Sequence, residues 1–120
     1  MSARRATPLY LVEDIAEARE RYSRLGFKLR ETGDPGCVGV SAGPTSIILV
    51  DRDYAERTLP ARAVLLLEQR SALYIWVESL EASRRGLRGV LLGEIDHDGL
   101  REWAVESDDG LMMLAETRAA

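Results

Sequence analysis

The sequence predicts an α+β fold built from two copies of a βαβββ unit. Three observations predict it: short apolar runs that end in acidic or turn residues, helical periodicity directly after two of these runs, and an internal repeat. Residues 73–80 align with residues 8–15, and residues 112–114 align with residues 47–49, both at an offset of 65. A chain of 120 residues is expected to form a single domain, residues 1–120.

The first unit covers about residues 7–51. The apolar run at residues 9–12 predicts a buried strand. A helix is expected next, because Asp14 is a favourable N-cap, Glu17 completes an acidic capping box and Gly26 is a common C-terminal residue. Three more strands are expected, separated by turns rich in glycine and proline, at residues 27–30, 37–41 and 46–50.

Residues 52–70 predict an irregular connector. It is long for a compact domain, which is typical of a functional or interfacial loop. Leu65, Leu66 and Leu67 fit a strand or a helical turn equally well. We expect this run to be exposed and to contribute to a homodimer.

The second unit covers about residues 71–116. A strand at residues 73–77 is followed by Ser79, which is expected to cap a helix that carries Leu80 and Leu87 and ends at Gly86 or Gly89. The remaining strands are expected from residue 90, at residues 101–106 and at residues 111–115, with turns at residues 96–99 and 107–110.

Composition argues against several partners. Acidic residues outnumber basic ones by 20 to 16 and the arginines are scattered, so we expect no nucleic-acid partner. No apolar run approaches the roughly 20 residues of a membrane helix, and the N-terminus lacks the apolar stretch of a signal peptide. The single Cys37 agrees with a reducing compartment, so we expect a cytoplasmic protein without a membrane partner.

Two segments resemble the vicinal-oxygen-chelate superfamily, which includes glyoxalase I, extradiol dioxygenases and bleomycin-resistance proteins. They are residues 11–22 with Leu25, Gly26 and Phe27, and the strand and turn at residues 101–110. The resemblance covers about residues 7–116. It implies that the two units are related by pseudo-two-fold symmetry and pair into a curved mixed sheet around a concave groove that holds the ligand, usually in a dimer.

Metal-dependent members of this superfamily hold one divalent ion with four side chains. The resemblance places those positions at Thr7, Leu49, Ala72 and Leu114. None of these side chains is an imidazole, carboxylate or thiolate, and a one-residue slip within residues 46–50 reaches no acid. We therefore expect no metal and no cofactor.

Strand alternation predicts that the groove is apolar and aromatic, which suits a flat apolar or aromatic molecule. Arg101 and Trp103 are in phase with each other, but alternation leaves their face open. A collapsed core without a pocket is the alternative. The expected ligand-binding residues are Leu9, Leu49, Ala72, Tyr74, Trp76, Arg101, Trp103, Met112 and Leu114.

The first functional hypothesis is a metal-free binding protein of the glyoxalase/bleomycin-resistance type that sequesters a small molecule for resistance or self-protection. The second is a lyase or isomerase with a non-standard acid or base such as Glu106, Glu116 or His97, and the third is an interaction domain without a pocket. His97 lies among turn residues and is expected to be a solvated loop residue. Cys37 is expected to be a small buried strand residue rather than a nucleophile.

Overall fold

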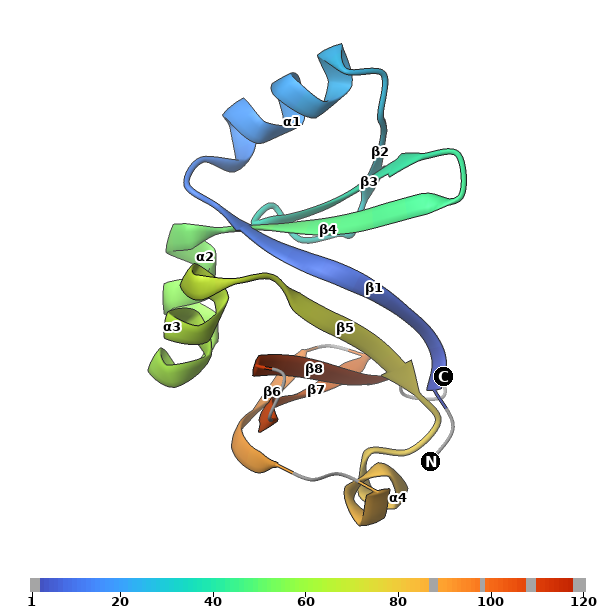
Figure 1. Ribbon diagram of the computed structural model, residues 1–120, viewed down its shortest axis with the longest axis vertical. Coiled ribbons are helices and arrows are strands. Elements are labelled where there is room, and N and C mark those ends of the chain that lie inside the picture. The colour runs from blue at the N-terminus through green and yellow to red at the C-terminus, as the bar shows by residue number, and fades with distance from the viewer. Residues whose placement is uncertain (1–2, 87–88, 98, 108–109, 118–120) are drawn as a thin grey trace.

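A computed structural model describes residues 3–86, 89–97, 99–107 and 110–117. These residues form one eight-stranded mixed sheet in the order β2-β3-β4-β1-β5-β8-β7-β6, with helices on both faces (Figure 1). The predicted α+β fold is confirmed. No helix in the described part of the chain is both long enough and apolar enough to cross a membrane.

The elements follow the predicted order, with two helices added between the halves. The strands are β1 (Ala3–Val12), β2 (Lys28–Glu31), β3 (Cys37–Ala42), β4 (Thr45–Asp51), β5 (Ala72–Val77), β6 (Val90–His97), β7 (Leu100–Ser107) and β8 (Gly110–Thr117). The helices are α1 (Ile15–Arg24), α2 (Arg52–Thr58), α3 (Ala61–Gln69) and α4 (Leu80–Ser83), with a 3₁₀ turn at Arg84–Gly86.

The internal repeat is visible in the strand register. Strand β1 pairs in parallel with β4, with Leu9 opposite Ile48. Strand β5 pairs in parallel with β8, with Tyr74 opposite Met113. Both residues of the second pair are 65 positions after those of the first, and β1 and β5 pair antiparallel at the centre of the sheet.

Helix α1 forms as predicted. The Asp14 carboxylate accepts hydrogen bonds from the amides of Ala16 and Glu17, which satisfies two free donors of the first turn. The chain leaves the helix through Gly26 at φ 95°, a conformation that favours glycine. In the second half, β6 continues to His97, so the turn expected at residues 96–99 begins later. Leu87, residue 98 and residues 108–109 lie outside the described residues.

The prediction of an irregular connector at residues 52–70 is wrong. Asp51 caps α2 by accepting from the amides of Asp53 and Tyr54, and α3 begins directly after Pro60. Leu66 and Leu67 are 9% and 3% exposed because they pack on the sheet. Of the three leucines proposed as a dimer contact, the structure leaves Leu65 exposed, at 43%.

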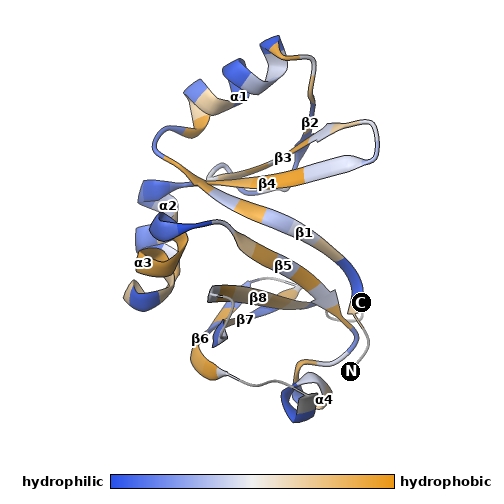
Figure 2. Cartoon of the chain, in the orientation of Figure 1, coloured by the Kyte–Doolittle hydropathy of each residue, from blue (hydrophilic) through white to orange (hydrophobic). Residues whose placement is uncertain are grey.

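The helices divide the sheet into two faces that we call outer and inner. The outer face is covered by α1 over the first half and α4 over the second, above two separate apolar clusters. The inner face is covered at one end by α2 and α3, which form a third cluster with β1, β5 and β8 (Figure 1). Figure 2 shows hydrophobic residues on the central strands and on α3, next to the mostly hydrophilic α2.

Candidate functional site

Four of the nine predicted ligand-binding residues lie on the inner face. In β5, Ala72, Tyr74 and Trp76 alternate onto one side of the strand. Leu9 lies directly opposite Ala72, which places it on the same face. The sequence prediction of a shared face is correct for these four residues.

The other five point to the outer face: the expectation of one common surface is wrong for Leu49, Met112 and Leu114, and the face that alternation left open for Arg101 and Trp103 is the outer one. Leu114 is the partner of Ile75, which alternates away from Tyr74, and the same register carries Trp103 and Arg101 to that side. Two of the predicted metal positions, Leu49 and Leu114, are one residue out of register with the inner face. Because side chains alternate with a period of two, a slip of one residue reverses the face. The residues concerned are Leu49, Arg101, Trp103, Met112 and Leu114.

Arg101 is engaged on the outer face. Its guanidinium makes ion pairs at 2.9 Å with Glu81, 2.8 Å with Glu94 and 3.5 Å with Glu116. The hydrogen bonds that Arg101 donates to Glu81 and Glu94 raise the pKa of its guanidinium. Arg101 therefore ties α4 to the sheet and does not face the inner side.

The inward-facing residues beside the expected metal positions also lack donors. In β4 they are Ile48 and Val50, and in β8 they are Met113 and Ala115. Thr7 uses its hydroxyl to donate to the Ser46 carbonyl at 2.9 Å. Among the described residues there is no group of three or more His, Cys, Asp or Glu side chains that could hold a metal. These side chains do not fit the divalent ion that four protein ligands hold in metal-dependent members of the superfamily that the sequence resembles. No metal chemistry follows from this site.

One end of the inner face is filled by protein. Apolar residues of α3 pack against Leu9 and Ala72, which is 3% exposed. Pro60, directly before α3, lies close to Gly93 of β6. A Cβ atom placed on Gly93 would be 2.8 Å from Pro60 Cγ. Ala72 therefore lies beneath the helices and does not line an open space.

The other end carries a chain of polar contacts that begins at Tyr74. The Tyr74 hydroxyl donates to Glu102 Oε2, and Glu102 Oε1 is 2.9 Å from His97 Nε2. Glu102 is 8% exposed, and the His97 side chain is 32% exposed. Burial, followed by the charge of Glu102, raises the pKa of Tyr74, so its hydroxyl remains a donor.

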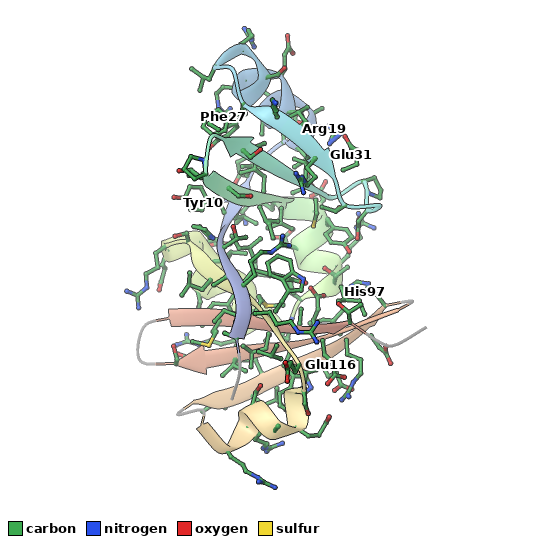
Figure 3. The ribbon with its side chains drawn as sticks, turned by 90° about the vertical axis from the view of Figure 1, so that its right-hand side faces the viewer. Tyr10, Arg19, Phe27, Glu31, His97 and Glu116 are labelled. Carbon is green, nitrogen blue, oxygen red and sulfur yellow. The ribbon has the colours of Figure 1, made fainter. Side chains whose placement is uncertain are left out.

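His97 is therefore not the solvated loop residue that turn chemistry predicted. It is the last residue of β6 and points to the inner side. Figure 3 shows His97 and Glu116 on opposite sides of the second half of the sheet. Of the three acid or base candidates, Glu116 accepts from the Leu80 amide on the outer face. Glu106 pairs with Arg62 at 2.9 Å, which lowers the pKa of its carboxyl.

Two rings and a cation lie beside this polar chain. The Tyr74 and Trp76 ring centroids are 4.6 Å apart at an interplanar angle of 56°. Arg5, the inward-facing partner of Trp76 on β1, places its Cζ atom 4.0 Å from the indole centroid. Trp76 is half-buried and Arg5 is exposed.

Curvature brings the first half of the sheet over the second. Five strand spacings separate β3 from β7, about 24 Å in a flat sheet, yet Cys37 of β3 packs against the same apolar cluster as Ala104 of β7. Burial, followed by the charges of Asp34, Glu102 and Asp51, raises the pKa of Cys37 to about 12. The thiol is therefore neutral near pH 7, which fits a structural residue rather than a nucleophile.

A shallow surface hollow lies elsewhere. It encloses about 470 Å³ between α1 and β2 and is lined by Ala16, Arg19, Glu20, Ser23, Arg24 and Leu29. Its Arg19 pairs with Glu31 across the hollow (Figure 3). This hollow is open to solvent and contains no buried polar group, so we place the candidate site on the inner face.

Sequence reasoning missed Arg5 and Glu102. Arg5 is in phase with Thr7 and Leu9, and this alternation was available in the sequence once β1 was extended toward the N-terminus. Glu102 lies between Arg101 and Trp103 in the sequence and points to the opposite face of β7. Which face that is follows only from the register of β7 against β8.

Comparison with known proteins finds similarity in structure. The chain matches no family model and no curated protein. A glyoxalase/bleomycin resistance protein/dioxygenase superfamily member from Vibrio splendidus 12B01 is 16% identical with a TM-score of 0.57, covering 96% of this chain and 99% of that one. An uncharacterized protein from Methanosarcina mazei is 15% identical with a TM-score of 0.57, covering 100% and 97%. Methylmalonyl-CoA epimerase from Mycobacterium tuberculosis is 20% identical with a TM-score of 0.54, covering 94% and 87%.

Proposed function

We propose that this chain, which has the fold of the glyoxalase/bleomycin resistance/dioxygenase superfamily, binds a small organic molecule at the inner face without a metal ion. The proposed site is the end of the inner face where Glu102, His97 and Trp76 lie. The observation that carries the proposal is the buried polar chain of Tyr74, Glu102 and His97 beside the half-buried Trp76.

A buried carboxylate is costly unless its hydrogen bonds are satisfied, and a well-packed apolar group of similar size would do the same structural work at lower cost. The outer clusters consist of such apolar groups, for example Leu49 and Leu114 at 0% exposure. Polar groups kept at the edge of an apolar surface are typical of ligand sites, where they orient the bound molecule. The chemistry of this end therefore supports binding better than packing alone.

The expected ligand is flat. The half-buried Trp76 ring, which packs against Tyr74, offers a surface for an aromatic contact, and His97 offers a hydrogen-bonding nitrogen at the same end of the face. Sequestration of such a molecule, for resistance or self-protection, needs no reaction.

The test uses the two tryptophans, which lie on opposite faces. In Trp103→Phe the remaining reporter is Trp76, and in Trp76→Phe the remaining reporter is Trp103. Planar aromatic compounds should quench the fluorescence of Trp103→Phe in a saturable way and leave Trp76→Phe unchanged. Equal responses of both variants, or no response of either, would remove the site. If Trp103→Phe does not fold, the unmodified chain and Trp76→Phe give the same comparison.

A second candidate is a lyase or isomerase that uses His97 as its acid or base. The favouring observation is the 2.9 Å contact, because a carboxylate that orients an imidazole is a common arrangement in proton transfer. Once a bound molecule is identified by mass spectrometry of the purified protein, NMR in D₂O tests whether one of its C–H protons exchanges. Exchange that is lost in His97→Asn while binding persists would establish the enzyme over the binding protein.

A cytoplasmic homodimer remains a proposal. Between α1 and α4 the outer face exposes Tyr10 at 37% and Leu73 at 47%, which supports a contact there in place of the buried Leu66. Light scattering should give a dimer mass, and Leu73→Asp should give a monomer mass with an unchanged circular dichroism spectrum. A monomer mass for the unmodified chain at micromolar concentration would contradict the proposal.

A further inference from the structure

We infer that the molecule bound at this end of the inner face is a planar aromatic carboxylate, held by Arg5 and Trp76 together. This inference rests on the proposed function and specifies the ligand class of the same site. It follows from the charges that remain available to a ligand there.

Arg5 is the first of these charges. Its guanidinium lies 4.0 Å from the Trp76 centroid, and it makes no ion pair with a carboxylate of any described residue. Two arginines that anchor helices differ from Arg5: Arg101 contacts three glutamates, and Arg52 contacts Glu13, Glu56 and Glu68. Arg5 therefore presents an uncompensated positive charge at an aromatic surface.

Glu102 does not offer an opposite charge to a ligand. One of its oxygens accepts from Tyr74, the other contacts His97, and the residue is 8% exposed. A cationic ligand would have to displace one of these partners and would also meet Arg5. The charged group left for a ligand is the Arg5 guanidinium, which suits an anion.

The stacking of Arg5 leaves its hydrogen-bond donors available. A guanidinium that lies over a ring keeps its N–H groups at its edges, where a carboxylate binds in a bidentate arrangement. A carboxylate attached to a flat ring can pair with Arg5 while the ring contacts the half-buried Trp76. Neither a neutral aromatic nor a small inorganic anion makes both contacts.

The experiment compares three probes of similar shape: 1-naphthoate, 1-naphthalenemethanol and 1-naphthylmethylamine. Their affinities are measured by quenching of Trp76 in Trp103→Phe and by calorimetry with the unmodified chain. We expect 1-naphthoate to bind at least tenfold more tightly than the neutral probe, and the amine to bind most weakly. Arg5→Gln should reduce the preference for 1-naphthoate over the alcohol to less than threefold.

Arg4→Gln is the matched control, because it removes the same charge from the neighbouring position of β1, and Arg5 is the arginine that stacks on Trp76. It should keep the preference. Arg5→Lys should give an intermediate preference, since an ammonium keeps the charge without the bidentate geometry. Circular dichroism checks that each variant is folded.

The outcomes separate the two proposals. If the acid and the alcohol bind equally and both quench Trp76, the inference is overturned and the binding site stands. If Arg4→Gln and Arg5→Gln reduce the preference equally, the effect is one of net charge and the inference is overturned. If no probe affects Trp76, the proposed function fails first.

Discussion

The two faces of the sheet are built from the same strands but differ in what they bury. The outer face buries apolar side chains beneath α1 and α4, with Leu49, Leu80 and Leu114 fully enclosed. The inner face is apolar only beneath α2 and α3, and its other end buries Glu102 between Tyr74 and His97. Apolar packing accounts for the two outer clusters, whereas the polar end of the inner face is the feature on which the proposed function rests.

The largest effect is expected where the helices cover the inner face. Leu66→Asp places a charge in the cluster beneath α3 and should destabilise the protein by about 4 kcal/mol or more. Leu65→Asp, at a position that is 43% exposed, should change stability by less than about 0.5 kcal/mol. Urea unfolding followed by circular dichroism measures both. A folded Leu66→Asp variant with a smaller oligomeric mass would make Leu66 an interface residue.

Leu114→Ala tests the outer face. Leu114 is fully buried beside Trp103, so truncation should cost about 3 kcal/mol through lost burial and a residual cavity. The affinity of a ligand on the inner face should stay within a factor of two in the same variant. A large loss of affinity would show that the two faces do not act independently.

Ala72→Phe tests the covered end of the inner face. Because α3 packs on Ala72, the larger ring should overpack the cluster at a cost of about 1–3 kcal/mol. Denaturant unfolding measures this cost. Unchanged stability combined with loss of ligand binding would show instead that the space beside Ala72 is open.

The smallest effect is expected for Tyr74→Phe, which removes the hydroxyl that donates to Glu102. The loss should be about 1.5 kcal/mol, because the bond ends on a buried carboxylate and a hydrogen bond to a charged group is worth more than a neutral one. Tyr10→Phe, at a residue 37% exposed on the outer face, is the control and should be neutral. Equal stabilities of the two variants would indicate that the polar chain contributes nothing to folding.

Much of the fold was predictable because it depends on local chemistry. Asp14 and Gly26 mark the start and the end of α1 whatever the helix packs against. The repeat at an offset of 65 reappears as the same strand register in both halves of the sheet. The helices of the connector were missed because α2 and α3 are short and their caps, Asp51 and Pro60, also fit a turn.

The sequence by itself determined the order of the strands, the position of the first helix and the two-fold repetition. Only the tertiary structure decided which strand residues share a face, because a side-chain period of two makes a one-residue slip reverse every assignment. It also brought Glu102, His97 and Tyr74 together from three strands and placed Cys37 near them. Such contacts depend on strand register and sheet curvature, which arise from the packing of the whole chain and are not encoded in any local segment.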